Sequence, residues 1–115
     1  MKSYPVSLEF HSARIERGHT HNFMVRPPNP FKMRYVEVDE KVAEALEVVD
    51  FRVGHYSQTA SMAPAQLTMF LEPNTEKYRL GFDTCQANDS ITLVLRNTSD
   101  HDVEFSGKLC GTERR

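Results

Sequence analysis

The chain has 115 residues, 26% of them charged, and a formal net charge of -2 at pH 7. This length predicts one domain, residues 1–115, whose core can be continuous without disulfide or metal cross-links. The near balance of charges excludes the clustered Lys/Arg excess of nucleic-acid-binding proteins. Because no apolar run approaches the ~20 residues that cross a bilayer, we expect no membrane partner and synthesis in the cytoplasm.

Short stretches of alternating apolar and polar residues recur along the chain, separated by Gly, Pro and Asn turns. This spacing predicts strands of about five to nine residues and few helices. The eight expected strands are residues 7–15, 19–26, 34–38, 46–53, 67–70, 78–83, 90–97 and 103–110. The pattern predicts an all-β fold, a two-sheet antiparallel β-sandwich of the jelly-roll type.

The segment 39–49 departs from this pattern, because its apolar residues recur at helical spacing among good helix formers. This spacing favours a short helix near 39–45. The following residues alternate like a strand, but the alternation slips by one position at Val49-Asp50, which is typical of a β-bulge. We expect a helical turn followed by a bulged strand.

The strongest local pattern lies near the end of the sequence. The apolar residues of ITLVLRN (91–97) alternate, and the alternation resumes in VEFSGKLCGT (103–112) after the polar residues 98–101. Two alternating runs joined by a short polar turn predict a β-hairpin.

His19 and His21 form an H-x-H pair, which a strand would place on one face, where two imidazoles can chelate a metal. Small barrel metalloenzymes with this pair also use a nearby carboxylate, whereas the next acidic residue here is Glu37. We expect no metal site. The alternative is that both imidazoles face solvent, with Phe23 and Val25 on the core face after a register change.

The two cysteines, Cys85 and Cys110, lack the CxxC or Cys/His spacing of zinc sites. We expect two free, buried thiols, since free cysteine is among the most buried residue types; a bridge between them is the alternative that the sequence leaves open. Neither cysteine lies beside a positive cluster that would activate it towards His55 or His101. The sequence therefore predicts no catalytic residue and no cofactor.

Aromatic residues occur in nearly every expected strand, as core-filling residues should. Tryptophan is absent, which disfavours a sugar-stacking surface, although Tyr35, Tyr56 and Tyr78 could form one. A carbohydrate- or receptor-binding β-sandwich module is therefore the alternative function.

Four motifs follow one another in the sequence: R-P-x-x-P-F at 26–31, V-G-x-x-S-Q at 53–58, R-N-T-S at 96–99 and F-x-G-x-L-x-G-T at 105–112. With them, residues 18–112 resemble small jelly-roll proteins of bacteriophage virions. The resemblance implies a structural minor capsid, decoration or vertex protein without catalysis. It also implies binding to the major capsid protein, self-association around a symmetry axis, and a location in the virion after synthesis in the host cytoplasm.

Contacts with such partners are expected at the loop tips and at the two chain termini. Proline fixes φ and extends the residue before it, so the run 27–30 predicts a stiff loop that presents Phe31. The small, polar residues 58–66 predict a second loop. The expected interface residues are Pro27, Pro28, Pro30, Phe31, His55, Tyr56, Met62 and Pro64.

Overall fold

A computed structural model describes residues 2–60 and 64–115. Its strands are β1 (Ser3–Glu9), β2 (Ala13–Ile15), β3 (Thr20–Val25), β4 (Phe31–Glu37), β5 (Leu46–Val53), β6 (Tyr56–Ser57), β7 (Ala65–Gln66), β8 (Ile91–Asn97), β9 (Val103–Phe105) and β10 (Lys108–Arg114). Its helices are α1 (Glu40–Glu44), the 3₁₀ turn η1 (Leu67–Phe70) and α2 (Asn74–Lys77). In the part of the chain that is described, no helix is long and apolar enough to span a membrane.

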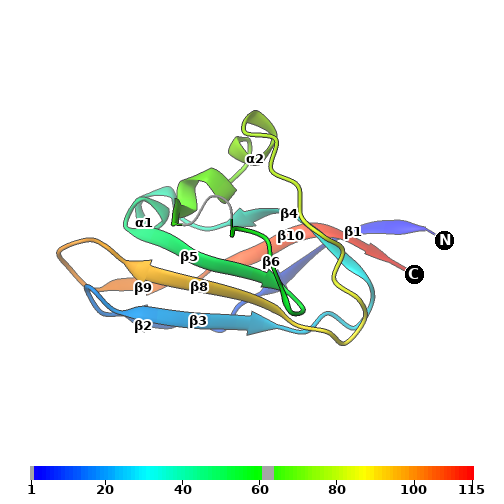
Figure 1. Cartoon of the computed structure of the whole chain (residues 1–115), viewed down its shortest axis with the longest axis horizontal. Helices are drawn as coiled ribbons and strands as arrows, with labels where there is room; N and C mark the ends of the chain where they lie inside the picture. The colour runs from blue at the N-terminus through cyan, green and yellow to red at the C-terminus, as the bar shows by residue number, and fades with distance from the viewer. Residues whose placement is uncertain (1, 61–63) are drawn as a thin grey trace.

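The strands form two antiparallel layers around one core (Figure 1). One sheet has the order β1-β10-β4, and the other has the order β3-β8-β5-β6, with β7 also paired to β5. The short pair β2-β9 continues the direction of β1 and β10. The expected all-β, sandwich-like architecture of antiparallel sheets is confirmed.

Two of the expected strands are each divided in two, and the breaks lie opposite each other. The expected strand 7–15 becomes β1 and β2, and 103–110 becomes β9 and the start of β10. The amide of Phe10 still donates to the carbonyl of Gly107 (3.0 Å) between the two pairs. A Cβ at position 107 would come within 2.7 Å of the Phe105 ring, so glycine permits this close bend.

The predicted hairpin near the end of the chain is wrong. β8 pairs with β3 and β5, whereas β9 pairs with β2. The side chain of Asn97, fully buried, donates to the carbonyls of Ile15 (2.9 Å) and His101 (2.8 Å) and accepts from the amide of Ser99 (2.9 Å). These bonds fix a loop that carries the chain into the other layer. The polar residues between the two runs therefore form a crossover.

The short helix and the bulge are both confirmed. In α1, the carboxylate of Asp39 caps the helix by accepting from the amides of Lys41 (2.8 Å) and Val42 (3.4 Å). The register between β5 and β8 then shifts between Val48 and Asp50. One extra residue thus returns the apolar side chains of β5 to the core.

The expected strands 67–70 and 78–83 are wrong. Residues 67–70 form η1, and residues 78–83 follow α2 without forming a strand. Leu67 and Phe70 are three residues apart, so a 3₁₀ turn places both on one side, whereas a strand would place them on opposite faces. Both are fully buried, which favours the turn. Beyond α2, Arg79 has a φ of 54°, outside the strand region.

Two aromatic clusters lie on either side of β8, because Leu93 pairs with Phe23 of β3 and with Phe51 of β5. Their ring centroids lie 4.6–6.2 Å apart. The β3-side cluster consists of Phe10, Phe23 and Phe105, and the β5-side cluster of Phe51, Phe70 and Phe82. All six rings are buried.

Candidate functional site

The proline loop at 27–30, the β5–β6 turn with His55 and the two termini lie at one end of the molecule, at the right in Figure 1. The amide of Asn88 donates to the carbonyl of Pro27 (2.8 Å), and the amide of Gly54 donates to the carbonyl of Ser90 (2.8 Å). These bonds join the loop before β4, the loop before β8 and the β5–β6 turn. The turn is tight, since Gly54 has a φ of 60° and a Cβ there would meet the Asp89 carboxylate at 2.8 Å.

Only part of the predicted contact set is exposed at this end. Tyr56 is 73% exposed, and Pro28 and His55 are also exposed. Pro64 is exposed too, but it adjoins β7, which pairs with Glu47 and Val48 at the other end of β5. Pro30 is half-buried and Pro27 is buried. Met62 lies outside the described residues.

The expectation that the proline loop presents Phe31 is wrong. Phe31 begins β4 and is fully buried, and its backbone forms two hydrogen bonds with Cys85 (2.9 and 2.7 Å). The prolines do stiffen the approach to β4, but the strand directs the ring inward. The most exposed aromatic side chain among the described residues is that of Tyr56.

A polar network that the sequence analysis missed holds the β5–β6 turn in place. The hydroxyls of Ser57 (2.6 Å) and Thr59 (3.3 Å) both donate to the carboxylate of Asp50. Thr59 is fully buried and also accepts from the amide of Phe51 (3.2 Å). This network fixes the backbone on both sides of Tyr56. The sequence indicates this network only weakly, because its signal is two hydroxyl residues, Ser57 and Thr59, at alternate positions after a turn.

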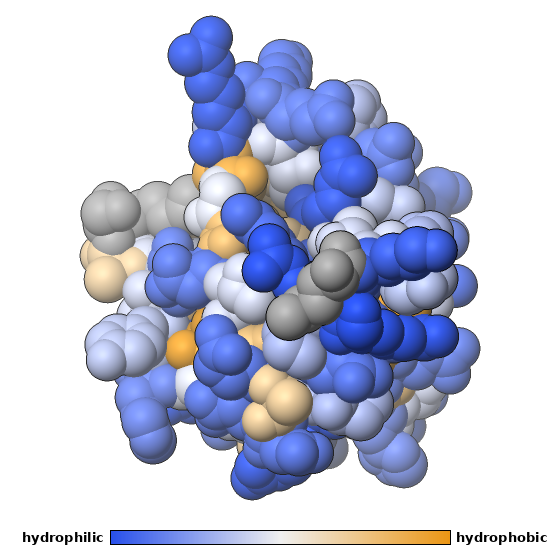
Figure 2. Space-filling view, turned by 90° about the vertical axis from the view of Figure 1, so that its right-hand side faces the viewer, coloured by the Kyte–Doolittle hydropathy of each residue, from blue (hydrophilic) through white to orange (hydrophobic). Residues whose placement is uncertain are grey.

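The surface at this end is mainly hydrophilic. Figure 2 looks along the molecule onto the end that carries the termini and the contact loops, and apolar side chains show there only in small, separate areas. Large apolar patches usually mark stable protein interfaces, whereas polar surfaces suit contacts that also use hydrogen bonds and charges. A partner at this end would therefore bind through polar groups around Tyr56.

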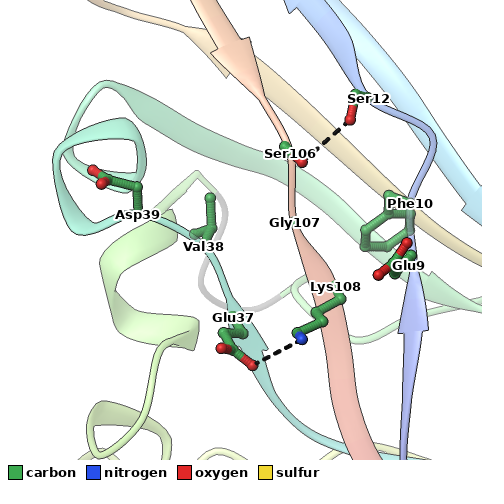
Figure 3. Close-up of a pocket in the computed structure, with 9 residues that line it drawn as sticks. All are labelled: Glu9, Phe10, Ser12, Glu37, Val38, Asp39, Ser106, Gly107 and Lys108. Carbon is green, nitrogen blue, oxygen red and sulfur yellow. Dashed lines mark hydrogen bonds and ion pairs between the residues drawn. The ribbon is translucent and has the colours of Figure 1, made fainter.

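A groove of about 470 Å³ lies where the β1-β10 pair bends into β2-β9 (Figure 3). Lys108 pairs with Glu37 (3.7 Å), and the hydroxyl of Ser12 donates to that of Ser106 (3.2 Å). The carboxylate of Asp39 points away from this ion pair in Figure 3. Within residues 2–60 and 64–115, no three acidic, His or Cys side chains converge to hold a metal ion. The groove offers hydrogen bonds to a partner but no assembled catalytic set.

No register change separates His21 from Phe23 in β3, so that part of the expectation is wrong, and His19 lies just before the strand. His21 shares a face with Phe23 in an unbroken register, and their ring centroids are 4.6 Å apart. His19 lies 3.8 Å from the Glu16 carboxylate. Both imidazoles are exposed. His21 covers the rim of the β3-side cluster.

Cys85 and Cys110 are free, buried thiols, as expected, and no bridge joins them. Burial raises the pKa of both thiols. The Glu37 carboxylate, 3.4 Å from the Cys110 sulfur, raises that pKa further. A raised pKa keeps a thiol protonated and weakly nucleophilic at neutral pH.

The three tyrosines of the carbohydrate alternative lie on separate elements. Tyr35 is in β4, where the neighbouring Cys110 thiol raises its pKa to about 12. Tyr56 is at the β5–β6 turn, and Tyr78 follows α2 beside the ammonium of Lys77. Among the described residues, no ring contact joins any two of these tyrosines. They do not form a stacking platform.

Comparisons with protein-family models, with curated proteins and with solved structures found no match for this chain. The resemblance to phage virion proteins therefore stays a prediction, and the geometry of the chain itself has to support any function.

Proposed function

We propose that this chain is a jelly-roll domain that serves as a non-catalytic, capsid-associated component of a bacteriophage virion. Its partners would be the major capsid protein and further copies of itself around a symmetry axis. The observation that carries the proposal is the nested order of the strand pairs.

The nesting runs inward from both ends of the chain. β1 pairs with β10, β2 with β9, β3 with β8, the first residue of β4 with Cys85, and β5 with β6. Such a chain is one long antiparallel hairpin. Rolling it into two layers adds the pairs β10-β4 and β5-β8, which are both present. A double-sheet jelly roll built from two Greek keys has this arrangement, and capsid proteins are among its known users.

The site supports a binding role better than a chemical one. The apolar side chains are concentrated in the core. The raised pKa values keep both thiols protonated. The groove where the β1-β10 pair bends into β2-β9 is polar and open. The β5–β6 turn presents Tyr56 from a backbone that hydrogen bonds hold in place. Exposed tyrosine is favoured at protein contacts, because one end is apolar and the other forms a hydrogen bond.

The test is binding to capsids from which this protein has been deleted. Wild-type protein should cosediment with the capsids at a saturating ratio, and the Tyr56→Ala variant should bind at least about tenfold more weakly. Tyr78→Ala is the matched control, because it removes an exposed tyrosine away from the contact end and should bind like wild type. Absence of cosedimentation, together with binding to a glycan array, would favour the carbohydrate-binding module and overturn the proposal.

A further inference from the structure

The outer edge of β3 offers unused backbone hydrogen-bonding groups. β3 is the last strand on one side of its sheet, with β8 on its inner side (Figure 1). The amide of Asn97 donates to the carbonyl of His19 (3.0 Å), so odd-numbered residues of this segment direct their backbone towards β8. The N–H and C=O groups of Thr20, Asn22 and Met24 therefore point away from the sheet.

Nothing in the described part of the chain covers this edge. β8 is the strand that pairs with β3 within residues 2–60 and 64–115, and no loop there donates to or accepts from the three outward backbone positions. The side chains of Thr20, Asn22 and Met24 are exposed, Met24 by 54%. An exposed edge of this kind is a template for another strand.

One edge strand of the other sheet, β1, is protected. Lys2 and Arg115 exchange two backbone hydrogen bonds (3.3 and 3.1 Å), so even-numbered residues of β1 face β10 and odd-numbered ones face outward. Pro5 occupies an outward position and has no N–H to give to a partner. Proline and lysine are common devices against edge pairing, and the sequence of β3 contains neither.

We propose that β3 pairs antiparallel with β3 of a second copy, about a twofold axis beside Asn22. In this register Asn22 faces Asn22 of the second copy, and Thr20 faces Met24. Each outward N–H then meets an outward C=O of the second copy. β3 contains no Asp, Glu, Lys or Arg, so no such charges oppose each other across the axis.

The inner face of the same strand supports this register. His21 would lie opposite Phe23 of the second copy, in a pair that makes no backbone hydrogen bond across the interface. Such pairs bring their side chains closest together, and aromatic cross-strand pairs are stabilising. The contact would join the two β3-β8-β5-β6 sheets into one continuous sheet. The proposal specifies the self-association part of the proposed function, but it rests on backbone geometry and does not depend on capsid binding.

The test measures the mass of the purified chain by sedimentation velocity from micromolar to millimolar concentration. Wild type should form a dimer as the concentration rises. Asn22→Lys and Asn22→Glu each place like charges opposite each other, and each should raise the dissociation constant at least about tenfold. An equimolar mixture of the two variants should form a heterodimer, because the opposite charges then face each other.

Two controls test whether the dimer forms through β3 and not through β1. Ser7→Lys adds the same charge to the protected edge β1 and should leave the dimer unchanged. Amide exchange at Thr20, Asn22 and Met24 should slow as the wild-type concentration rises, while exchange at Ser7 should not. A wild-type monomer at every concentration would overturn the proposal, as would a dimer that survives both Asn22 variants or a mixture that stays monomeric. Capsid binding does not enter this test, so the two proposals fail independently.

Discussion

The two aromatic clusters differ in the backbone that holds them. The β3-side cluster comes from strands and from the bend between β1 and β2, whereas two of the three rings of the β5-side cluster come from η1 and from the irregular residues after α2. Both clusters are equally buried and contact the same strand, β8. The comparison shows that a core can be closed by a strand ladder on one side and by packed turns on the other. The stability of the two sides should differ accordingly.

The largest expected effect is the loss of a ring from the β3-side cluster. Phe105→Ala should lower the free energy of unfolding by about 3–5 kcal/mol, because β9 is paired with β2 and the ring packs against Phe23 of the paired strand β3, so that the backbone around the cavity cannot collapse. Phe82→Ala should cost roughly 2–3 kcal/mol, since its segment has no strand partners and can move into the space. Denaturant unfolding of the two variants measures the difference. A loss for Phe82→Ala as large as that for Phe105→Ala would remove the distinction between the clusters.

The next effect concerns the crossover loop beside the β3-side cluster. Asn97→Ala leaves the carbonyls of Ile15 and His101 without their donor, and should cost about 1–3 kcal/mol. Asn29→Ala is the control, because the side chain of this half-buried asparagine makes no hydrogen bond within residues 2–60 and 64–115 and should change stability by no more than about 0.5 kcal/mol. Equal unfolding midpoints for the two variants would show that the buried amide does not hold the crossover.

A smaller effect is expected where the segment after α2 attaches to the β5–β6 turn. The Gln58 side chain donates to the Asp83 carboxylate (3.1 Å) and accepts from the Asp83 amide (2.8 Å). Gln58→Ala should cost about 1 kcal/mol and should increase amide exchange in residues 78–83. Amides of β9 and β10 serve as the internal reference. Exchange that rises equally in β9 and β10 would mean that the segment does not open on its own.

The smallest expected effect is a pH dependence of the folding stability that arises from Tyr35 in β4. The pKa of Tyr35 is raised to about 12, first by the Cys110 thiol and also by burial and by Glu72 of the segment before α2. Because the folded pKa lies above the ordinary value near 10, the protonated phenol favours the folded state. This contribution is complete below pH 10 and should be lost as the pH rises towards 12. Tyr35→Phe should flatten that part of the stability profile, and an unchanged slope would contradict the assignment.

Sequence reasoning succeeded where the local pattern and the tertiary structure agree. Alternation located most of the paired strands, and helix formers beside a slipped register located α1 and the bulge. It failed where tertiary contacts decide: the apolar character of residues 67–70 suggested a strand, whereas the burial of both Leu67 and Phe70 favours a turn. The hairpin prediction failed because alternation does not reveal which strand is the partner. That choice depends on the buried side chain of Asn97.

The same limit applies to the candidate site. The turn signals placed Tyr56 and His55 at a loop tip, where the structure also has them. The prolines indicated a stiff loop, but not the inward direction of Phe31, which depends on its pairing with Cys85. Sequence alone also could not show that Asp50, Ser57 and Thr59 converge, because their contact requires the β5–β6 turn to be folded.

The most direct test of the proposed virion role is quantitative mass spectrometry of virus particles purified from a culture that expresses this gene. The account predicts that the chain purifies with the major capsid protein at a constant ratio across the particle peak of a density gradient. A chain found only in the soluble lysate, and absent from intact particles, would contradict it.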